Sequence, residues 1–172
     1  MTGVSFIGPA MTSSADATRE LAGAIAGLAR GGDVVLLAGE LGAGKTCFTQ
    51  GFGKALGIDE PITSPTFTLL RPYDGRLRLL HADVYRLEHL QEILDLGIAE
   101  LVDDDAVAVI EWGDMAEPVL PADFLEIRIT YDDADDGDAE EVRRFAFRAV
   151  GASWGNRVAA LQRSLAPWTA TS

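Results

Sequence analysis

The segment from Leu36 to Phe48, "LLAGELGAGKTCF", carries the strongest structural signal in this chain. Within it, "GELGAGKT" (39–46) fits the pattern G-x-x-x-x-G-K-[ST], whose glycine-rich backbone cradles nucleotide phosphates. The apolar run "DVVLLAG" (33–39) comes directly before the loop and predicts a strand that is buried on both faces. The segment from Lys45 to Leu56 predicts a helix. A strand, a glycine-rich loop and a helix in this order are what a phosphate-binding P-loop requires.

The loop residues have distinct expected roles. Lys45 is expected to reach the β- and γ-phosphates of a bound nucleotide, and Thr46 to offer its hydroxyl to Mg²⁺. Lysine is rare in this chain, because only Lys45 and Lys54 occur among the 14 basic residues, and one of them stands where the loop needs it. The expected nucleotide-binding set of the loop is Gly39, Glu40, Leu41, Gly42, Ala43, Gly44, Lys45 and Thr46.

Two predicted strands end on an acidic residue, as the metal site of a P-loop protein requires. Glu111 directly follows the apolar residues 106–110 and is therefore the stronger candidate to complete a Mg²⁺ site. Asp83 ends the segment "LRLLHAD" (77–83), and three interpretations of it stay open. It could orient or deprotonate the attacking water, share the metal, or lie on the surface at the end of its strand.

Three further residues allow both a functional and a structural interpretation. His81 alternates with Asp83 on one side of its strand, but a histidine in such a place is more often structural than catalytic. Thr66, in "ITSPTFTLL" (62–70), could sense a γ-phosphate or cap a turn. Cys47 is the single cysteine, which excludes an internal disulfide and favours a small packed residue over a redox role.

The remaining patterns surround the loop with further strands and helices. Residues 13–32 predict a helix that begins at a capping box of Ser13 and Asp16 and stops at two glycines. Residues 66–85 predict two strands joined by an Asp-Gly turn, and residues 87–97 predict a short helix. Residues 124–131 and 142–149 alternate apolar with polar side chains and predict an antiparallel pair. A last helix is expected from 153 to about 166.

These elements together predict an α/β fold of the P-loop NTPase-like kind. Central parallel strands are expected near the loop, flanked by antiparallel strands, with helices on both faces of the sheet. Residues 1–172 are expected to form a single P-loop domain, because this length suits one core and no repeat or linker interrupts it. A loose tail is expected over residues 167–172.

Composition and missing motifs narrow the function. The chain has 14 basic and 27 acidic residues and a formal charge of −13, so unaided binding of nucleic acid is not expected. No basic-then-apolar leader and no apolar run of membrane-spanning length are evident, which favours a cytoplasmic protein without membrane contact. The single asparagine, Asn156, is followed by arginine, so the N-K-x-D element of GTPases is excluded.

Four segments that occur in order, "GELGAGKT", "SPTFTL", "HADVYRL" and "VIEWGD", resemble the TsaE (YjeE) family. These are the small bacterial ATPases needed for making threonylcarbamoyladenosine (t6A) in tRNA. The P-loop alone is generic, whereas H-x-D-x-Y-R and I-E-W at this spacing from it are highly specific. The resemblance covers most of the chain and implies slow hydrolysis of ATP with Mg²⁺, which becomes useful when the protein is docked on the TsaD and TsaB proteins.

The resemblance also implies roles for individual residues. Lys45 and Thr46 would hold phosphate and Mg²⁺, Glu111 would complete the metal site, and Asp83 would serve hydrolysis. Trp112 would matter for activity by packing near the nucleotide or the partner.

Ser14 and Ala15, at the start of the first helix, would lie near the adenine base. Two positions depart from the family pattern, since Cys47 replaces a common threonine and Glu40 a frequent aspartate. Neither change removes a phosphate or metal ligand. Two other functions stay open: a small P-loop kinase, although residues 58–105 offer no lid of adequate length, and an ATP-binding regulatory module without useful hydrolysis.

Overall fold

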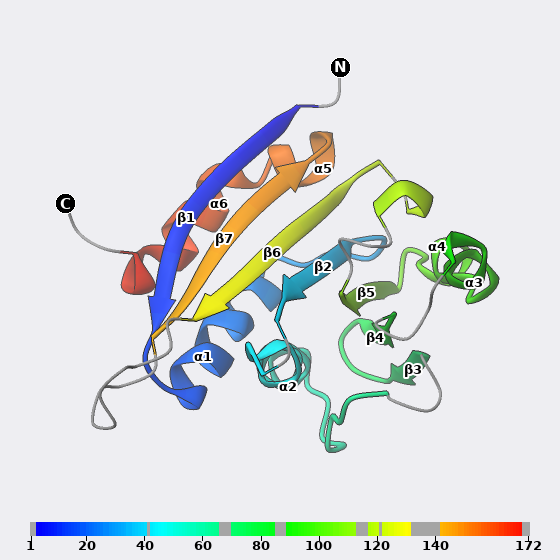
Figure 1. The fold of residues 1–172 in the computed structure, drawn as a ribbon, viewed down its shortest axis with the longest axis horizontal. Coiled ribbons are helices and arrows are strands. Elements are labelled where there is room, and N and C mark those ends of the chain that lie inside the picture. Colours follow the sequence, from blue (N-terminus) through cyan, green and yellow to red (C-terminus); the bar gives the residue numbers. More distant parts are fainter. Residues whose placement is uncertain are drawn as a thin grey trace.

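The computed structural model describes residues 3–40, 42–65, 70–84, 89–112, 117–120, 122–131 and 142–169. Over these residues a seven-stranded sheet forms the centre of the protein, with the strand order β1-β7-β6-β2-β5-β4-β3 (Figure 1). The strands are β1 (Val4–Thr12), β2 (Val34–Gly39), β3 (Leu70–Tyr73), β4 (Arg78–Asp83), β5 (Ala106–Glu111), β6 (Phe124–Tyr131) and β7 (Arg143–Val150).

The sheet is parallel at its centre and antiparallel at its margins. β2 pairs in parallel with both β5 and β6, and β4 pairs in parallel with β5. β7 runs antiparallel to β1 and β6, and β3 runs antiparallel to β4. All residues of β5 and all but the last of β2 are buried, because helices cover both faces at this point. The predicted fold class is therefore confirmed.

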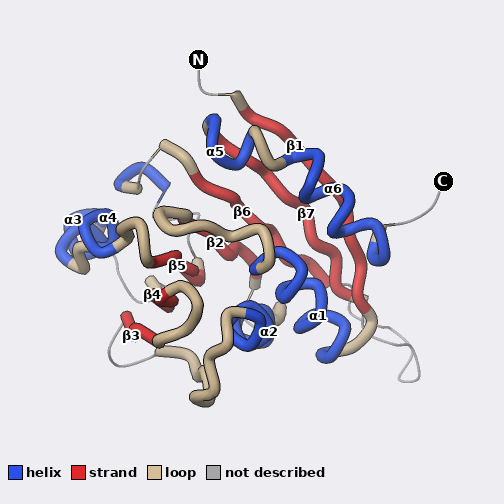
Figure 2. Tube along the Cα trace, turned by 180° about the vertical axis from the view of Figure 1, so that it is seen from behind, coloured by secondary structure: helices blue, strands red, loops and turns tan. Residues whose placement is uncertain are grey.

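Helices lie on both faces of the sheet. They are α1 (Ala15–Ala26), α2 (Lys45–Ala55), α3 (Leu90–Asp95), α4 (Ile98–Leu101), α5 (Ala152–Gly155) and α6 (Val158–Leu165), with 3₁₀ turns at Glu117–Val119 and Ala166–Trp168. Figure 2 shows α1, α2, α5 and α6 in front of the sheet. Buried side chains of α1, α2 and α6 form the larger core with this face. Ile93 of α3 and Ile98 of α4 belong to a second core on the opposite face.

The structure corrects several predicted boundaries. α1 is capped by Ser14, whose side chain accepts a hydrogen bond from the Ala17 backbone amide, and not by a box of Ser13 and Asp16. The helix ends at Ala26 rather than at residues 31 and 32. The last helix is divided into α5 and α6. β1 was not predicted at all; its register with β7 shifts between Ile7 and Ala10, which weakens the alternation that predicts a strand.

Arg157, between α5 and α6, ties the end of the chain to the start of β2. Its guanidinium donates two hydrogen bonds of 2.7 Å to the two carboxylate oxygens of Asp33, and a third of 2.9 Å to the Leu28 carbonyl. Arg157 is 4% exposed and Asp33 is 5% exposed. Beyond α6, Thr169 forms a bridge with Ala10, so residues 167–169 of the expected loose tail lie against β1.

None of the helices within the described residues is long and apolar enough to cross a membrane.

We expect Asp33→Ala to lower the free energy of unfolding by about 3–5 kcal/mol, because the substitution leaves the Arg157 guanidinium buried without its carboxylate. Urea unfolding followed by circular dichroism measures the change. The matched control is Glu60→Ala, which removes an exposed contact of 3.6 Å with Arg71 and should cost less than about 1 kcal/mol. Equal losses for the two variants would show that the buried pair does not stabilise the fold.

Candidate nucleotide-binding site

The P-loop leaves the end of β2 at Gly39 and enters α2 at Lys45. Gly39 has a φ of 155°, and a Cβ at this position would lie 2.7 Å from the Ile129 carbonyl oxygen of the neighbouring strand. Gly44, with a φ of 111°, is the N-cap residue of α2 and forms no side-chain cap. The backbone amides of the first turn therefore point toward the loop without a side chain to satisfy them, as an anion site requires.

The side chain of Lys45 lies at the mouth of this loop. Its ammonium donates hydrogen bonds to the carbonyls of Gly39 (2.7 Å) and Glu40 (2.9 Å). The same ammonium lies 3.8 Å from the centre of the Trp112 ring, a cation–π contact. Lys45 is only 5% exposed, so these contacts hold a buried charge beside the phosphate cradle.

Two neighbouring strands bring acidic side chains to the same edge of the sheet. Asp83 at the end of β4 is paired in register with Glu111 at the end of β5. The Thr46 hydroxyl donates to one Glu111 oxygen, Oε1, at 3.1 Å. The Ser64 hydroxyl donates to Asp83 at 3.3 Å. Thr46 and Glu111, which the sequence predicts to hold the same metal ion, are therefore in contact.

His81 is the residue of this site that sequence analysis set aside. Its side chain is fully buried, and Nε2 lies 2.6 Å from the other Glu111 oxygen, Oε2. The available signals were its place at the start of the H-x-D-x-Y-R segment and its alternation with Asp83 on one face of a strand. That pattern could not show that the neighbouring strand would offer Glu111 to the ring.

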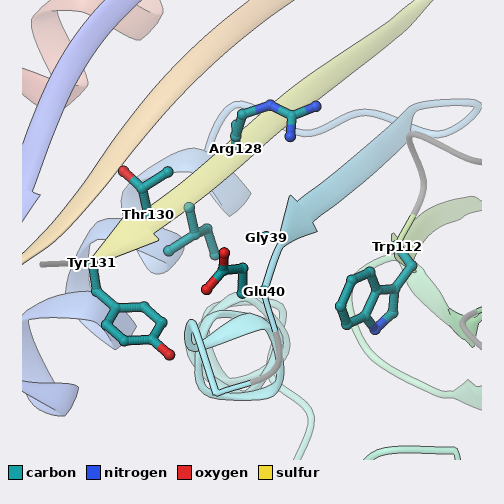
Figure 3. A pocket seen from close by; sticks show the side chains of 7 residues that line it. Gly39, Glu40, Trp112, Arg128, Thr130 and Tyr131 are labelled. Atoms are coloured by element: carbon teal, nitrogen blue, oxygen red, sulfur yellow. The ribbon is translucent and has the colours of Figure 1, made fainter. Parts of the chain in front are cut away.

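A pocket of about 530 Å³ opens on one side of the P-loop (Figure 3). Figure 3 shows Glu40 between the Tyr131 ring on one side and the Trp112 ring on the other. Trp112 has a φ of 63°, a conformation that is strained for a tryptophan. The lining residues are Gly39, Glu40, Trp112, Arg128, Ile129, Thr130 and Tyr131. The contribution of β6 was not predicted, because no local pattern indicates that β6 lies beside β2.

A smaller hollow of about 210 Å³ lies where α1 begins beside α2. Its lining residues are Ser13, Ser14, Ala15, Thr18, Gly44, Cys47 and Arg143. The Cys47 thiol lies 3.5 Å from the Ala15 carbonyl oxygen, and Arg143 donates to the Gly42 carbonyl at 3.4 Å. Ser14 and Ala15, expected beside the base, thus lie next to the P-loop. Leu41 and Thr66, the other two expected site residues, lie outside the described residues.

Oxygen atoms from the start of α2 and from the ends of β4 and β5 fit Mg²⁺. Thr46 offers a hydroxyl, and Glu111 and Asp83 offer carboxylates at the same edge of the sheet. Among the described residues no three His, Cys, Asp or Glu side chains gather as a complete metal site. This donor set suits Mg²⁺, which is usually bound by one or two carboxylates together with waters and substrate phosphates rather than by an all-protein cage.

The fold and the site define a P-loop protein of the nucleotide-binding class. The family model described as "Threonylcarbamoyl adenosine biosynthesis protein TsaE" matches residues 12–142. The chain therefore belongs to the TsaE family, and the predicted resemblance is confirmed.

Individual relatives agree with this assignment. The TsaE protein of Bacillus subtilis is 43% identical over 141 residues, which cover 81% of this chain and 84% of the relative. The TsaE protein of Streptomyces coelicolor is also 43% identical, over 79% of this chain and 93% of the relative. A crystal structure of Bacillus subtilis YdiB matches with a TM-score of 0.68 and 34% identity, over 97% of both chains.

Cys47 offers a test of the geometry at the smaller hollow. Burial raises the pKa of its thiol, an effect larger than the opposing influence of Arg19. Because the thiolate is the reactive form, we expect iodoacetamide to react more slowly at pH 8 with the folded chain than with the urea-unfolded chain. The midpoint of the pH–rate curve should also be higher for the folded chain. Glutathione with and without urea controls for the reagent, and equal midpoints would contradict the described environment of Cys47.

Proposed function

We propose that this protein is a Mg²⁺-dependent ATPase that acts in the t6A modification of tRNA and hydrolyses ATP within a TsaD–TsaB complex. Its membership of the TsaE family supports a role in the t6A pathway. The observation that supports the chemistry most directly is the contact between Thr46 and Glu111 beside the P-loop. A hydroxyl on the loop and a carboxylate on the adjacent strand end are the protein ligands that a P-loop metal site uses.

Each residue of the site has a role in this proposal. Lys45 exchanges its contacts with the loop carbonyls and Trp112 for contacts with the β- and γ-phosphates of ATP. Bound Mg²⁺ would neutralise the negative charge that develops on these phosphates. Thr46 and Glu111 hold the metal. Asp83, held by Ser64, either orients and deprotonates the attacking water or shares the metal.

The base of ATP occupies the smaller hollow in this proposal. Ser14, Ala15 and Cys47 line it on the helix side, and Gly44 of the P-loop lines it as well. The larger pocket remains open beside Glu40 and Trp112, on the side of the loop where β6 ends. Weak hydrolysis by the isolated chain is consistent with a site that is open on this side, because water exclusion strengthens electrostatic stabilisation.

The partners in this proposal are proteins rather than tRNA. A formal charge of −13 disfavours stable contact with a phosphate backbone, whereas TsaD and TsaB can offer complementary surfaces. A cytoplasmic location and the absence of membrane contact follow from the same proposal. Residues 1–172 act as one P-loop ATPase domain.

Two rival functions make different predictions for the same site. A P-loop kinase would place phosphate on an acceptor molecule, so labelled γ-phosphate would appear on something other than water. An ATP-binding regulatory module would bind ATP equally well in the wild type and in Glu111→Gln, with no hydrolysis to lose. Retained ATP binding together with lost hydrolysis in Glu111→Gln separates the ATPase from this module.

We expect hydrolysis of ATP with Mg²⁺ to be weak for the purified chain and to rise when TsaD and TsaB are added. Lys45→Ala should lower the stimulated rate at least ~100-fold, because it removes a preorganised positive charge from the phosphates. Release of inorganic phosphate measures the rate. Lys54→Ala is the matched control, since it removes the exposed second lysine and should leave the rate unchanged. A rate indifferent to both partners would contradict the proposed role.

The base site can be tested separately. We expect Cys47→Leu to weaken ATP binding by about tenfold, because the larger side chain occupies the hollow beside Ala15, whereas Cys47→Ser should bind as the wild type does. Calorimetry with a non-hydrolysable ATP analogue measures the affinity. Saturating analogue should also protect Cys47 of the wild type from alkylation. Unchanged affinity in Cys47→Leu and no protection would place the base elsewhere.

A further inference from the structure

The pair of His81 and Glu111 is the most deeply buried polar contact of the site. The side chains are 0% and 4% exposed, and the distance from Nε2 to Oε2 is 2.6 Å. A carboxylate only accepts hydrogen bonds, so the ring donates through Nε2. A hydrogen bond to an ionised group that is shielded from water is stronger than one between neutral partners. This contact therefore restricts the orientation of the Glu111 carboxylate.

The two oxygens of Glu111 have separate partners. Oε2 accepts from His81, on the neighbouring strand β4, and Oε1 accepts from Thr46, at the start of α2. With Oε2 held by the ring, a single oxygen faces the hydroxyl that is expected to hold the metal. Without the ring, Oε2 would be buried without its donor, and the carboxylate would be free to turn.

The surroundings of His81 do not require a histidine for packing. Leu79, two residues earlier on the same face of β4, is fully buried in the core. His81 occupies the next inward position, where an apolar side chain would fill the space without the cost of burying a polar ring. Nδ1 of the ring has no hydrogen-bond partner among the described residues. The ring thus directs its hydrogen bonding in the described part of the chain to Glu111.

We propose that His81 is a positioning residue that holds the Glu111 carboxylate with one oxygen directed at Thr46 and the Mg²⁺ site. This inference rests on the proposed ATPase function. Groups that orient metal ligands from outside the coordination sphere typically account for 10–100-fold in metal affinity or activity. His81 acts through Glu111 and contacts neither nucleotide nor metal.

The chain allows a matched set of substitutions at this position. His81→Gln places an amide nitrogen near the position of Nε2 and keeps the donor to Glu111. His81→Asn places its amide near the position of Nδ1 and falls short of Glu111. His81→Leu fills the space without a donor. The Gln and Asn variants are both polar amides, so they differ mainly in reach. Their comparison carries the test even where the leucine variant does not fold.

Two measurements are needed. Calorimetry gives the affinity for a non-hydrolysable ATP analogue with and without Mg²⁺, and steady-state hydrolysis in the presence of TsaD and TsaB gives kcat, KM and the Mg²⁺ concentration for half-maximal rate. We expect His81→Asn and His81→Leu to lower kcat and raise the half-maximal Mg²⁺ concentration by about 10–100-fold. Binding of the analogue without Mg²⁺ should be unchanged, and His81→Gln should stay within about threefold of the wild type.

The outcomes separate this inference from the proposed function. If His81→Asn and His81→Leu keep the Mg²⁺ dependence of the wild type and lose only thermal stability, His81 has a structural role and the inference is overturned. If His81→Gln loses as much kcat and Mg²⁺ affinity as His81→Asn, a donor at the Nε2 position does not account for the effect. The inference is then also overturned. If Mg²⁺ does not strengthen analogue binding to the wild type itself, the proposed metal site fails, and the inference fails with it.

Discussion

Parallel pairing of β2, β5 and β4 assembles the chemistry of this protein. β5 lies between the other two strands, and the registers set Glu111 beside Leu37 of β2 on one side and beside Asp83 of β4 on the other. Because these strands run in the same direction, the loop after β2 and the acidic ends of β4 and β5 meet at one edge of the sheet. A shift of β5 by one residue would turn Glu111 to the opposite face, away from Thr46. The site therefore depends on a register that is set across the whole width of three strands.

The two ends of the parallel strands carry different kinds of polar contact. At the carboxyl edge, buried polar groups satisfy one another: the Lys45 ammonium contacts loop carbonyls, and Glu111 accepts from both Thr46 and His81. The contacts of Glu111 fix its carboxylate in advance, whereas in the proposed mechanism Lys45 exchanges its contacts for the phosphates. At the opposite edge, where β2 begins, Asp33 and Arg157 form a buried ion pair that fixes the last helices to the sheet. The buried ion pair and the P-loop site thus lie at opposite ends of the parallel strands.

Local sequence patterns predicted a feature correctly where all the residues that define the feature lie in one segment of the chain. The P-loop, its buried strand and its helix follow one another in the chain, and hydrophobic runs ending in acids identified Glu111 and Asp83. Such patterns failed where the feature depends on backbone geometry or on a contact with a distant segment. Ser13 and Ser14 are adjacent and chemically alike, and only the backbone geometry of α1 makes Ser14 the cap. β1 is an edge strand whose register with β7 is irregular, so its alternation is weak. Its pairing partner β7 lies near the other end of the chain, so no local pattern indicates the pairing.

The amino-acid sequence was sufficient to predict the P-loop and the type of fold, because glycine spacing and hydrophobic periodicity act over a few neighbouring residues. The resemblance of four ordered segments was sufficient to indicate the family. The arrangement of the site required the folded chain. His81 could not be distinguished from a structural histidine until β4 and β5 were aligned and its ring met Glu111. The pocket beside Trp112 could not be foreseen either, because β6 reaches it only through pairing with β2. Both features arise from hydrogen bonds between strands that are distant in sequence, and no local pattern records such pairing.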